Sequence, residues 1–236
     1  AAVFKELKDI FPSGTVHLGG DEAPTELWGK CPLCREARTK TGMKDEQEQM
    51  RAFFAKTTVL LAKNGQTPQF WYEGNAGIYH PGETVYAWRQ DQALQSIEKT
   101  KKAGLNLIMA SNEYCYLDFP QIQGQRNWGW MKTTTLQKCY ELDPAFGKPE
   151  KEAGHIRGVH APVWAERLPD LDHLLYRAYP RACAIAEAGW SPMSVRSWEN
   201  FRRKLADHRQ FILKRFNYDM KRTQGNEPAF RWENNK

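Results

Sequence analysis

Short apolar segments alternate with helical patterns along this chain, and that alternation limits its fold more than any other feature. The segments are rich in Val, Ile and aromatic residues, which is typical of buried strands. Alternation of strands and helices predicts a parallel α/β sheet. The five strand candidates are Thr15–Gly19, Gln69–Tyr72, Thr84–Trp88, Leu105–Ala110 and Gly158–Trp164, and the longest helices are expected over Leu171–Ala188 and Trp198–Phe216.

Two architectures fit this alternation, a doubly wound sheet and a (β/α)8 barrel of the TIM type. No glycine-rich phosphate loop opens any of the expected helices, which disfavours a nucleotide-binding sheet. We therefore predict an α/β fold of the (β/α)8 barrel type. The barrel is expected to be incomplete, because five strand candidates fall short of the eight in a closed barrel. Residues 1–222 are assigned to this partial barrel and residues 223–236 to a C-terminal tail.

The net charge of +6 raises the question of nucleic-acid binding. Basic residues are spread along the chain and mixed with acids, and the densest clusters, Lys99–Lys102 and Arg202–Lys204, fit solvated helix faces. We expect no nucleic-acid partner. No run of roughly 18 apolar residues occurs, so no membrane span is predicted. The first six residues lack the apolar region of a signal peptide, but a leader can be removed, so a secreted or periplasmic location is kept as a hypothesis.

Five cysteines offer one short motif, Cys31-Pro32-Leu33-Cys34. The spacing fits a zinc knuckle, but a structural zinc site needs four ligands and no second pair of this kind follows. An odd number of cysteines argues against a full disulfide framework. Packing at the start of a helix, or a local disulfide, is the favoured interpretation, and no metal or other cofactor is expected.

The segment His17-Leu18-Gly19-Gly20-Asp21-Glu22 combines a strand end, two glycines and two adjacent carboxylates. Neighbouring side chains on a regular strand point to opposite faces, so two carboxylates can share a pocket only if the backbone leaves strand geometry. Glycine permits that departure. Two carboxylates in different surroundings can then serve as an acid and an anion. The alternative interpretation is a helix N-cap followed by an exposed Glu, which on this segment alone would be preferred.

The same segment resembles the signature of glycoside hydrolase family 20, the β-N-acetylhexosaminidases. Further segments resemble other parts of the family in the family's order, which makes the resemblance specific although each segment alone is modest. It covers nearly the whole chain, from Phe11 to Pro192. The matching segments are Phe70–Glu73, Tyr86–Arg89, Tyr116–Asp118, Val163–Glu166, Pro180-Arg181, Ala186-Glu187 and Trp190–Pro192.

This resemblance implies removal of a terminal β-linked N-acetylhexosamine, GlcNAc or GalNAc, from a glycan with retention. In this group the acetamido oxygen of the substrate attacks the anomeric carbon, an exception to the usual pair of carboxylates. Glu22 matches the general acid and Asp21 the carboxylate that orients the acetamido N–H. Tyr116 matches the donor to the acetamido oxygen.

The resemblance also assigns substrate-binding residues. Indole faces suit the apolar acetamido slot, and carboxylates suit sugar hydroxyls as paired acceptors. Core packing or surface charge is the simpler interpretation of such residues taken singly. His17 is interpreted as a hydrogen-bonded core residue, and Arg89, Arg181 and Glu187 as structural. The matching residues are Trp71, Trp88 and Trp164 for the slot, and Asp118 and Glu166 for the hydroxyls.

The first three strands of the family's barrel have no counterpart in this chain, nor does an Arg that grips sugar hydroxyls. Three explanations stay open: a fragment of a longer protein, a homodimer or other partner chain that covers the open side, or a natural short variant. A sheet of five strands leaves edges bare, which motivates the dimer hypothesis. A non-catalytic N-acetylhexosamine-binding remnant is the alternative to an enzyme.

Overall fold

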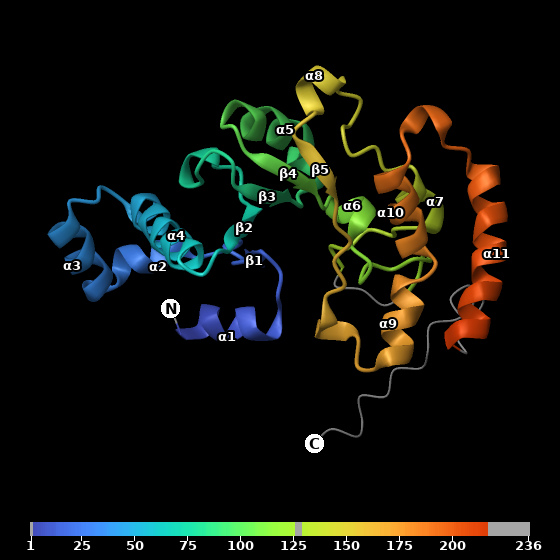
Figure 1. Ribbon diagram of the computed structural model, residues 1–236, viewed down its shortest axis with the longest axis horizontal. Coiled ribbons are helices and arrows are strands. Elements are labelled where there is room, and N and C mark those ends of the chain that lie inside the picture. Colours follow the sequence, from blue (N-terminus) through green and yellow to red (C-terminus); the bar gives the residue numbers. More distant parts are fainter. Residues whose placement is uncertain (1, 126–128, 217–236) are drawn as a thin grey trace. The chain divides into compact units, whose positions relative to one another are not determined.

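The computed structural model describes residues 2–125 and 129–216 (Figure 1). By their internal contacts they form two compact units, each of which is described by itself. Unit 1 comprises Ala1–Ile108 and Lys148–Arg157, and unit 2 comprises Met109–Gly147 and Gly158–Lys236. The expected tail, residues 223–236, lies outside the described residues, as do residues 126–128.

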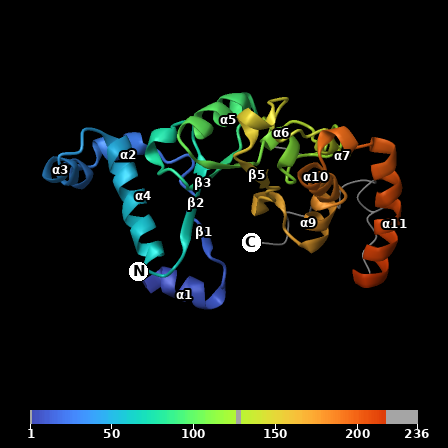
Figure 2. The ribbon, with the colours of Figure 1, turned by 45° about the horizontal axis from the view of Figure 1, so that its top comes forward.

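Unit 1 carries most of the sheet and the helices of the first half of the chain (Figures 1 and 2). Its elements are α1 (Ala2–Ile10), β1 (Thr15–His17), α2 (Thr25–Lys30), α3 (Pro32–Thr41), α4 (Glu46–Ala62), β2 (Thr67–Tyr72), η1 (Ala76–Ile78), β3 (Thr84–Ala87), η2 (Gln90–Gln92), α5 (Ala93–Lys102), β4 (Asn106–Met109), α8 (Glu150–Ala153) and β5 (Ile156–Val159). The last residues of β4 and β5 belong to unit 2.

Unit 2 is mainly helical. Its elements are α6 (Asn112–Cys115), α7 (Leu136–Tyr140), η3 (Ala165–Arg167), α9 (Leu171–Ala178), α10 (Arg181–Trp190), η4 (Met193–Val195) and α11 (Trp198–Phe216).

The five strands form one sheet in the order β1-β2-β3-β4-β5, which follows the sequence. The pairs β1–β2 and β2–β3 are parallel, with Val16 opposite Pro68 and Phe70 opposite Val85. Sequential order of parallel strands with helices between them is the arrangement of a (β/α) barrel rather than of a doubly wound sheet, whose order reverses. The predicted partial barrel is therefore confirmed.

Two of the predicted elements were wrong in extent. The fifth strand ends at Val159, whereas the apolar pattern predicted Gly158–Trp164. The reason is local, because Pro162 lacks an N–H for a ladder. The helix expected over Leu171–Ala188 is two helices, α9 and α10, joined through a cis bond between Tyr179 and Pro180. A proline disfavours helical geometry in the preceding residue, so the break could have been foreseen.

In unit 1, helix α4 packs on the sheet beside β2, and the two views agree on this (Figures 1 and 2). The rings of Phe54 and Phe70 have centroids 4.6 Å apart, and Phe70 is fully buried. Asp45 is the N-cap of helix α4, and its carboxylate accepts the N–H of Glu48 at 2.8 Å. The Glu48 carboxylate accepts the N–H of Lys44, so two otherwise unpaired donors are satisfied.

In unit 2, the core lies around α7 and α10, which pack against each other. Arg181 at the start of α10 is completely buried, and its guanidinium donates to the backbone carbonyls of Thr134 (2.9 Å), Leu117 and Arg177. Burial lowers the pKa of this arginine to about 10. Arg181 therefore connects α10 to the loops that contain Thr134 and Leu117 by hydrogen bonds to their backbone carbonyls, which fits the structural role expected for it.

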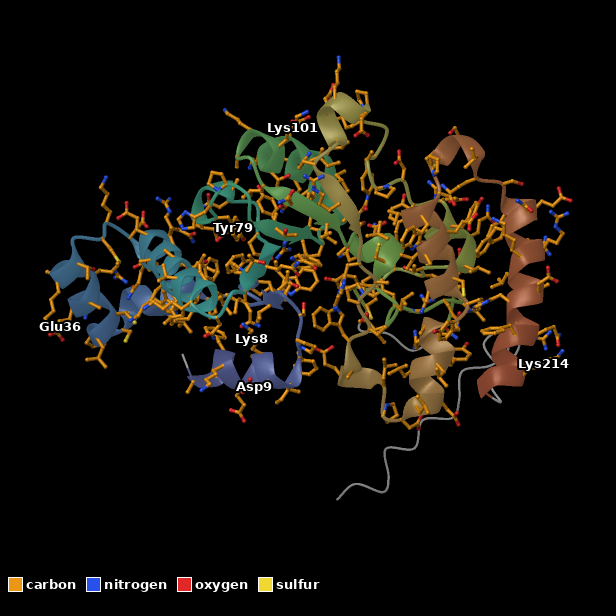
Figure 3. All side chains as sticks on the ribbon, viewed as in Figure 1. Lys8, Asp9, Glu36, Tyr79, Lys101 and Lys214 are labelled. Carbon is orange, nitrogen blue, oxygen red and sulfur yellow. The ribbon has the colours of Figure 1, made fainter. Side chains whose placement is uncertain are left out.

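The basic clusters are solvated. Lys99, Lys101 and Lys102 are exposed on α5 around a buried Thr100, and Figure 3 shows Lys101 on the outer side of that helix. Arg202, Arg203 and Lys204 are likewise exposed on α11. Among the described residues, no helix is both long and apolar enough to cross a bilayer.

Candidate active site

The loop after β1 leaves strand geometry through three residues with positive φ. Gly19 has φ +71°, Gly20 +96° and Glu22 +49°. A residue other than glycine with such a φ is uncommon, and strained backbone of this kind concentrates at functional sites. The expected departure at the two glycines is therefore present, and it extends to Glu22. Asp21, between them, is half-buried.

Gly20 is required for a second reason. A Cβ atom on this residue would lie 2.7 Å from Cζ of Phe54, which is 4% exposed in the core of unit 1. The loop thus passes directly over an aromatic ring that cannot move aside without disturbing β2. The loop that carries the two carboxylates therefore passes close to the core of unit 1 at Gly20.

A pocket of about 270 Å³ opens beside the loop, within unit 1. Glu22 lines it and its side chain is 68% exposed, whereas Asp21 is not among the lining residues. The two neighbouring carboxylates therefore lie in different surroundings. The other lining residues come from the loop after β1, from α2, from α4 and from the segment after β2 that ends with η1: Gly20 and Ala23, Thr25 and Glu26, Gln47 and Met50, and Glu73, Asn75 and Ile78.

Three aromatic rings meet on the sheet beside β1. The centroids of His17 and Trp71 are 5.1 Å apart, and those of His17 and Tyr86 4.8 Å apart. Trp71 is 7% exposed. His17 accepts the N–H of Gly19 on Nδ1 at 3.1 Å but is exposed. Its expected burial in a core was wrong, because β1 is the edge strand of the sheet and one side of it has no neighbour among the described strands.

Trp88 lies beyond the end of β3 and is tied to an acid that the sequence interpretation left without a role. Its indole N–H donates to Oε1 of Glu73 at 2.7 Å. Oε2 of Glu73 accepts from Nη2 of Arg89 at 3.3 Å. The signal for Glu73 was available, since it directly follows β2 in the segment Phe70–Glu73 and an acid at that point of a parallel sheet is a functional candidate.

In unit 2, the segments after β4 and β5 bring three of the expected residues together, namely Tyr116, Asp118 and Trp164. The N–H of Leu117 donates to the carbonyl of Pro162 at 2.9 Å, which joins the two segments. The ring centroids of Tyr116 and Trp164 are 6.1 Å apart. Tyr116 is buried, whereas Trp164 is 37% exposed. Glu166 is exposed on η3.

Asp118 is the carboxylate with the most perturbed surroundings in this part of unit 2. Its Oδ1 is buried without a hydrogen-bond partner. Burial raises its pKa to about 6, although the N–H groups of Asp118 and Trp164 and the charge of Arg181 oppose the shift. A buried, unsatisfied acceptor costs free energy, and strained or unpaired groups of this kind are candidates for ligand contact.

Cys31 and Cys34 are both free thiols, and Cys31 is the N-cap of α3. Their position at a helix start is as expected, while the local disulfide is not formed. Within residues 2–125 and 129–216, no group of three His, Cys, Asp or Glu side chains is arranged to hold a metal ion.

The chain matches the catalytic domain of glycosyl hydrolase family 20 over residues 1–193. It is 93% identical over its full length to a β-hexosaminidase of Akkermansia muciniphila, of which it covers 48%. A β-hexosaminidase of Porphyromonas gingivalis is 29% identical over 86% of the chain, which covers 26% of that protein.

A solved structure shows the same likeness. The crystal structure of a β-N-acetylhexosaminidase superimposes on 98% of this chain with a TM-score of 0.93 and 94% sequence identity. The chain covers 49% of that structure, so it spans about half the length of these near relatives. On the match over residues 1–193 and the two near-identical relatives, this chain belongs to glycoside hydrolase family 20.

Proposed function

We propose that the chain hydrolyses terminal, non-reducing β-linked N-acetylhexosamine from glycans, with retention and with assistance from the acetamido group of the substrate. The observation that carries this proposal is the loop after β1. Its positive φ values turn the carboxylate of Glu22 toward a pocket and leave Asp21 in other surroundings. The names of the near relatives support the substrate class.

In this proposal Glu22 protonates the leaving oxygen and then takes a proton from water. An acid with this task needs access to the leaving group and to water, and the 68% exposure of its side chain supplies both. Asp21 orients the acetamido N–H and stabilises the positive charge that develops on it. Adjacent carboxylates in unlike surroundings are suited to such a division of roles.

The remaining residues are assigned to binding. Tyr116 donates its hydroxyl to the acetamido oxygen, Trp71, Trp88 and Trp164 enclose the acetamido methyl, and Asp118 and Glu166 accept hydrogen bonds from sugar hydroxyls. The unpartnered Oδ1 of Asp118 supports its role, since a hydroxyl donor would satisfy it. Holding the acetamido oxygen against the anomeric carbon can contribute roughly 7–11 kcal/mol to lowering the barrier.

The experiment is a rate measurement with aryl β-glycosides of GlcNAc, GalNAc and glucose. We expect turnover of the two N-acetylated glycosides and not of the glucoside, which has no acetamido nucleophile. Glu22→Gln should lower kcat by about 10²–10⁴-fold, because the acid is lost while the shape is kept.

The matched control is Glu36→Gln, which removes one carboxylate from the exposed face of α3 (Figure 3) and should leave kcat unchanged. Binding of GlcNAc without any turnover would favour the alternative, a binding remnant of the fold. Equal rates for Glu22→Gln and the unmodified chain would remove Glu22 from the mechanism.

A further inference from the structure

Glu73 links two groups of the candidate site in unit 1, although it is assigned no part in the chemistry. It follows β2 directly, and its side chain is 23% exposed. Each carboxylate oxygen has its own partner, Nε1 of Trp88 at 2.7 Å and Nη2 of Arg89 at 3.3 Å. A carboxylate that is bound at both oxygens has a fixed orientation, and so do the donors that it binds.

Arg89 stands between Glu73 and the acid Glu22. The same Nη2 atom that donates to Glu73 lies 3.9 Å from Oε1 of Glu22. The guanidinium carbon also lies 4.1 Å from the ring centroid of Trp88, so the arginine is stacked on that indole. Both carboxylates line the pocket of about 270 Å³.

These contacts have opposite consequences for the acid. The guanidinium places a positive charge beside Glu22, at 3.9 Å. The shorter contact of Arg89, at 3.3 Å, is to Glu73, whose negative charge offsets that of the guanidinium. Glu73 and Arg89 thus contribute opposite charges to the surroundings of Glu22.

We propose that Glu73 is a positioning residue of the reaction: its carboxylate fixes the indole of Trp88 and engages Arg89, so that Glu22 stays available as the acid. The inference rests on the proposed function, because it takes Glu22 as the acid and Trp88 as a wall of the acetamido slot. It adds a residue that acts through others and touches no reacting atom.

The test uses the pH dependence of kcat/KM on an aryl β-N-acetylglucosaminide, whose alkaline limb reports loss of the proton from the acid. Glu73→Gln keeps an acceptor for the Trp88 N–H but removes the charge, so the alkaline limb should move to lower pH. Arg89→Met removes the opposing charge and should move the limb to higher pH. Each shift should be roughly 0.2–0.7 pH unit, the range for partly exposed pairs, and should shrink at high salt.

Three further variants control the interpretation. Arg89→Lys keeps the charge and should keep the limb of the unmodified chain, and the double variant Glu73→Gln with Arg89→Met should return close to it. Glu36→Gln removes a charge from the exposed face of α3 and should leave the alkaline limb unchanged. Unshifted limbs in both single variants, or shifts in the same direction, would overturn the proposal; if Glu73→Gln does not fold, the contrast of Arg89→Met with Arg89→Lys decides.

A second readout needs no turnover and so separates this proposal from the proposed function. The indole ¹H–¹⁵N resonance of Trp88, assigned by its loss in Trp88→Phe, should move upfield in Glu73→Met and stay near its position in Glu73→Gln. An unmoved resonance in Glu73→Met would refute the fixing of Trp88 by Glu73. If the unmodified chain shows no turnover but the Trp88 resonance still moves in Glu73→Met, the result would count against the proposed hydrolase activity. It would not count against the hydrogen bond between Trp88 and Glu73.

Discussion

At the scale of single residues, the carboxylates of the candidate site differ in what surrounds them. Glu22 is exposed at the rim of a pocket, Glu73 is bound at both oxygens, and Asp118 has one buried oxygen with no partner. In the proposed mechanism the same chemical group donates a proton at Glu22, holds its neighbours at Glu73 and receives a ligand at Asp118. Burial and hydrogen bonding decide between these roles.

The raised pKa of Asp118 predicts a pH-dependent stability. Its folded-state pKa of about 6 lies above the value of 3.8 for a free carboxyl, so the folded state binds the proton more tightly. The free energy of unfolding therefore falls as pH rises from about 3.8 and levels off above about 6. Asp118→Asn has no such cost, and its advantage in free energy of unfolding should grow from pH 4 to pH 7.5 by about 2 kcal/mol.

Urea unfolding at several pH values measures this difference. Asp207→Asn on α11, which replaces an exposed carboxylate of the same unit, is the matched control and should show no comparable trend. A constant difference between Asp118→Asn and the unmodified chain across this range would contradict the burial argument. The same substitution should weaken substrate binding, so stability and activity should change in opposite directions.

At the scale of elements, the site depends on short segments that leave regular structure at defined residues. Strand β1 is only three residues long, and the loop after it departs at Gly19 and Gly20. In unit 2, the guanidinium of Arg181 donates to the carbonyl of Leu117. This bond holds the loop that also carries Tyr116 and Asp118. Regular elements supply rigid ends, and the loops between them carry the chemistry.

Gly20→Ala should destabilise unit 1 and reduce activity. The new Cβ would meet the ring of Phe54 at 2.7 Å, and φ of +96° is strained for any side chain. We expect a loss of about 1–3 kcal/mol in urea unfolding. Gly19→Ala, strained but without a clash, should lose less, and Gly14→Ala, with nothing within 4 Å of its Cβ, should be nearly neutral. Equal effects at the three positions would contradict the proposed role of the Phe54 contact.

Arg181→Met should destabilise unit 2 by about 3 kcal/mol or more, because the buried carbonyls of Thr134, Leu117 and Arg177 lose their donor. Arg202→Met, an exposed arginine of α11, is the control. Thermal unfolding followed by circular dichroism compares them. A change no larger than that of the control would show that water can replace the guanidinium at these carbonyls.

The sheet could be predicted from the sequence, because apolar segments that alternate with helices are compatible with only a few sheet topologies. All five strand candidates correspond to strands, and the turn at Gly19-Gly20 follows from the residues themselves. The end of β5 and the break at Pro180 were missed, since local apolar pattern outweighed the proline signals. The bond between Trp88 and Glu73 joins residues 15 positions apart, and only the register of β2 with β3 reveals it.

At the scale of the whole molecule, the chain folds as two compact units and spans about half the length of its near relatives. Strand β1 forms one edge of the sheet, where exposed His17 lies. The hypothesis that a second copy or another chain covers the open side stays a prediction. Sedimentation at micromolar concentration tests it for the isolated chain, and a single monomeric species would count against a homodimer.

Whether Glu22 is the acid for the leaving group is best measured by the dependence of the rate on that leaving group. The ratio of kcat/KM between the unmodified chain and Glu22→Gln is measured for an activated nitrophenyl β-N-acetylglucosaminide and for an alkyl β-N-acetylglucosaminide. An activated leaving group departs with little protonation, so we expect a much larger ratio for the alkyl glycoside. The same ratio for both glycosides would show that Glu22 is not the acid.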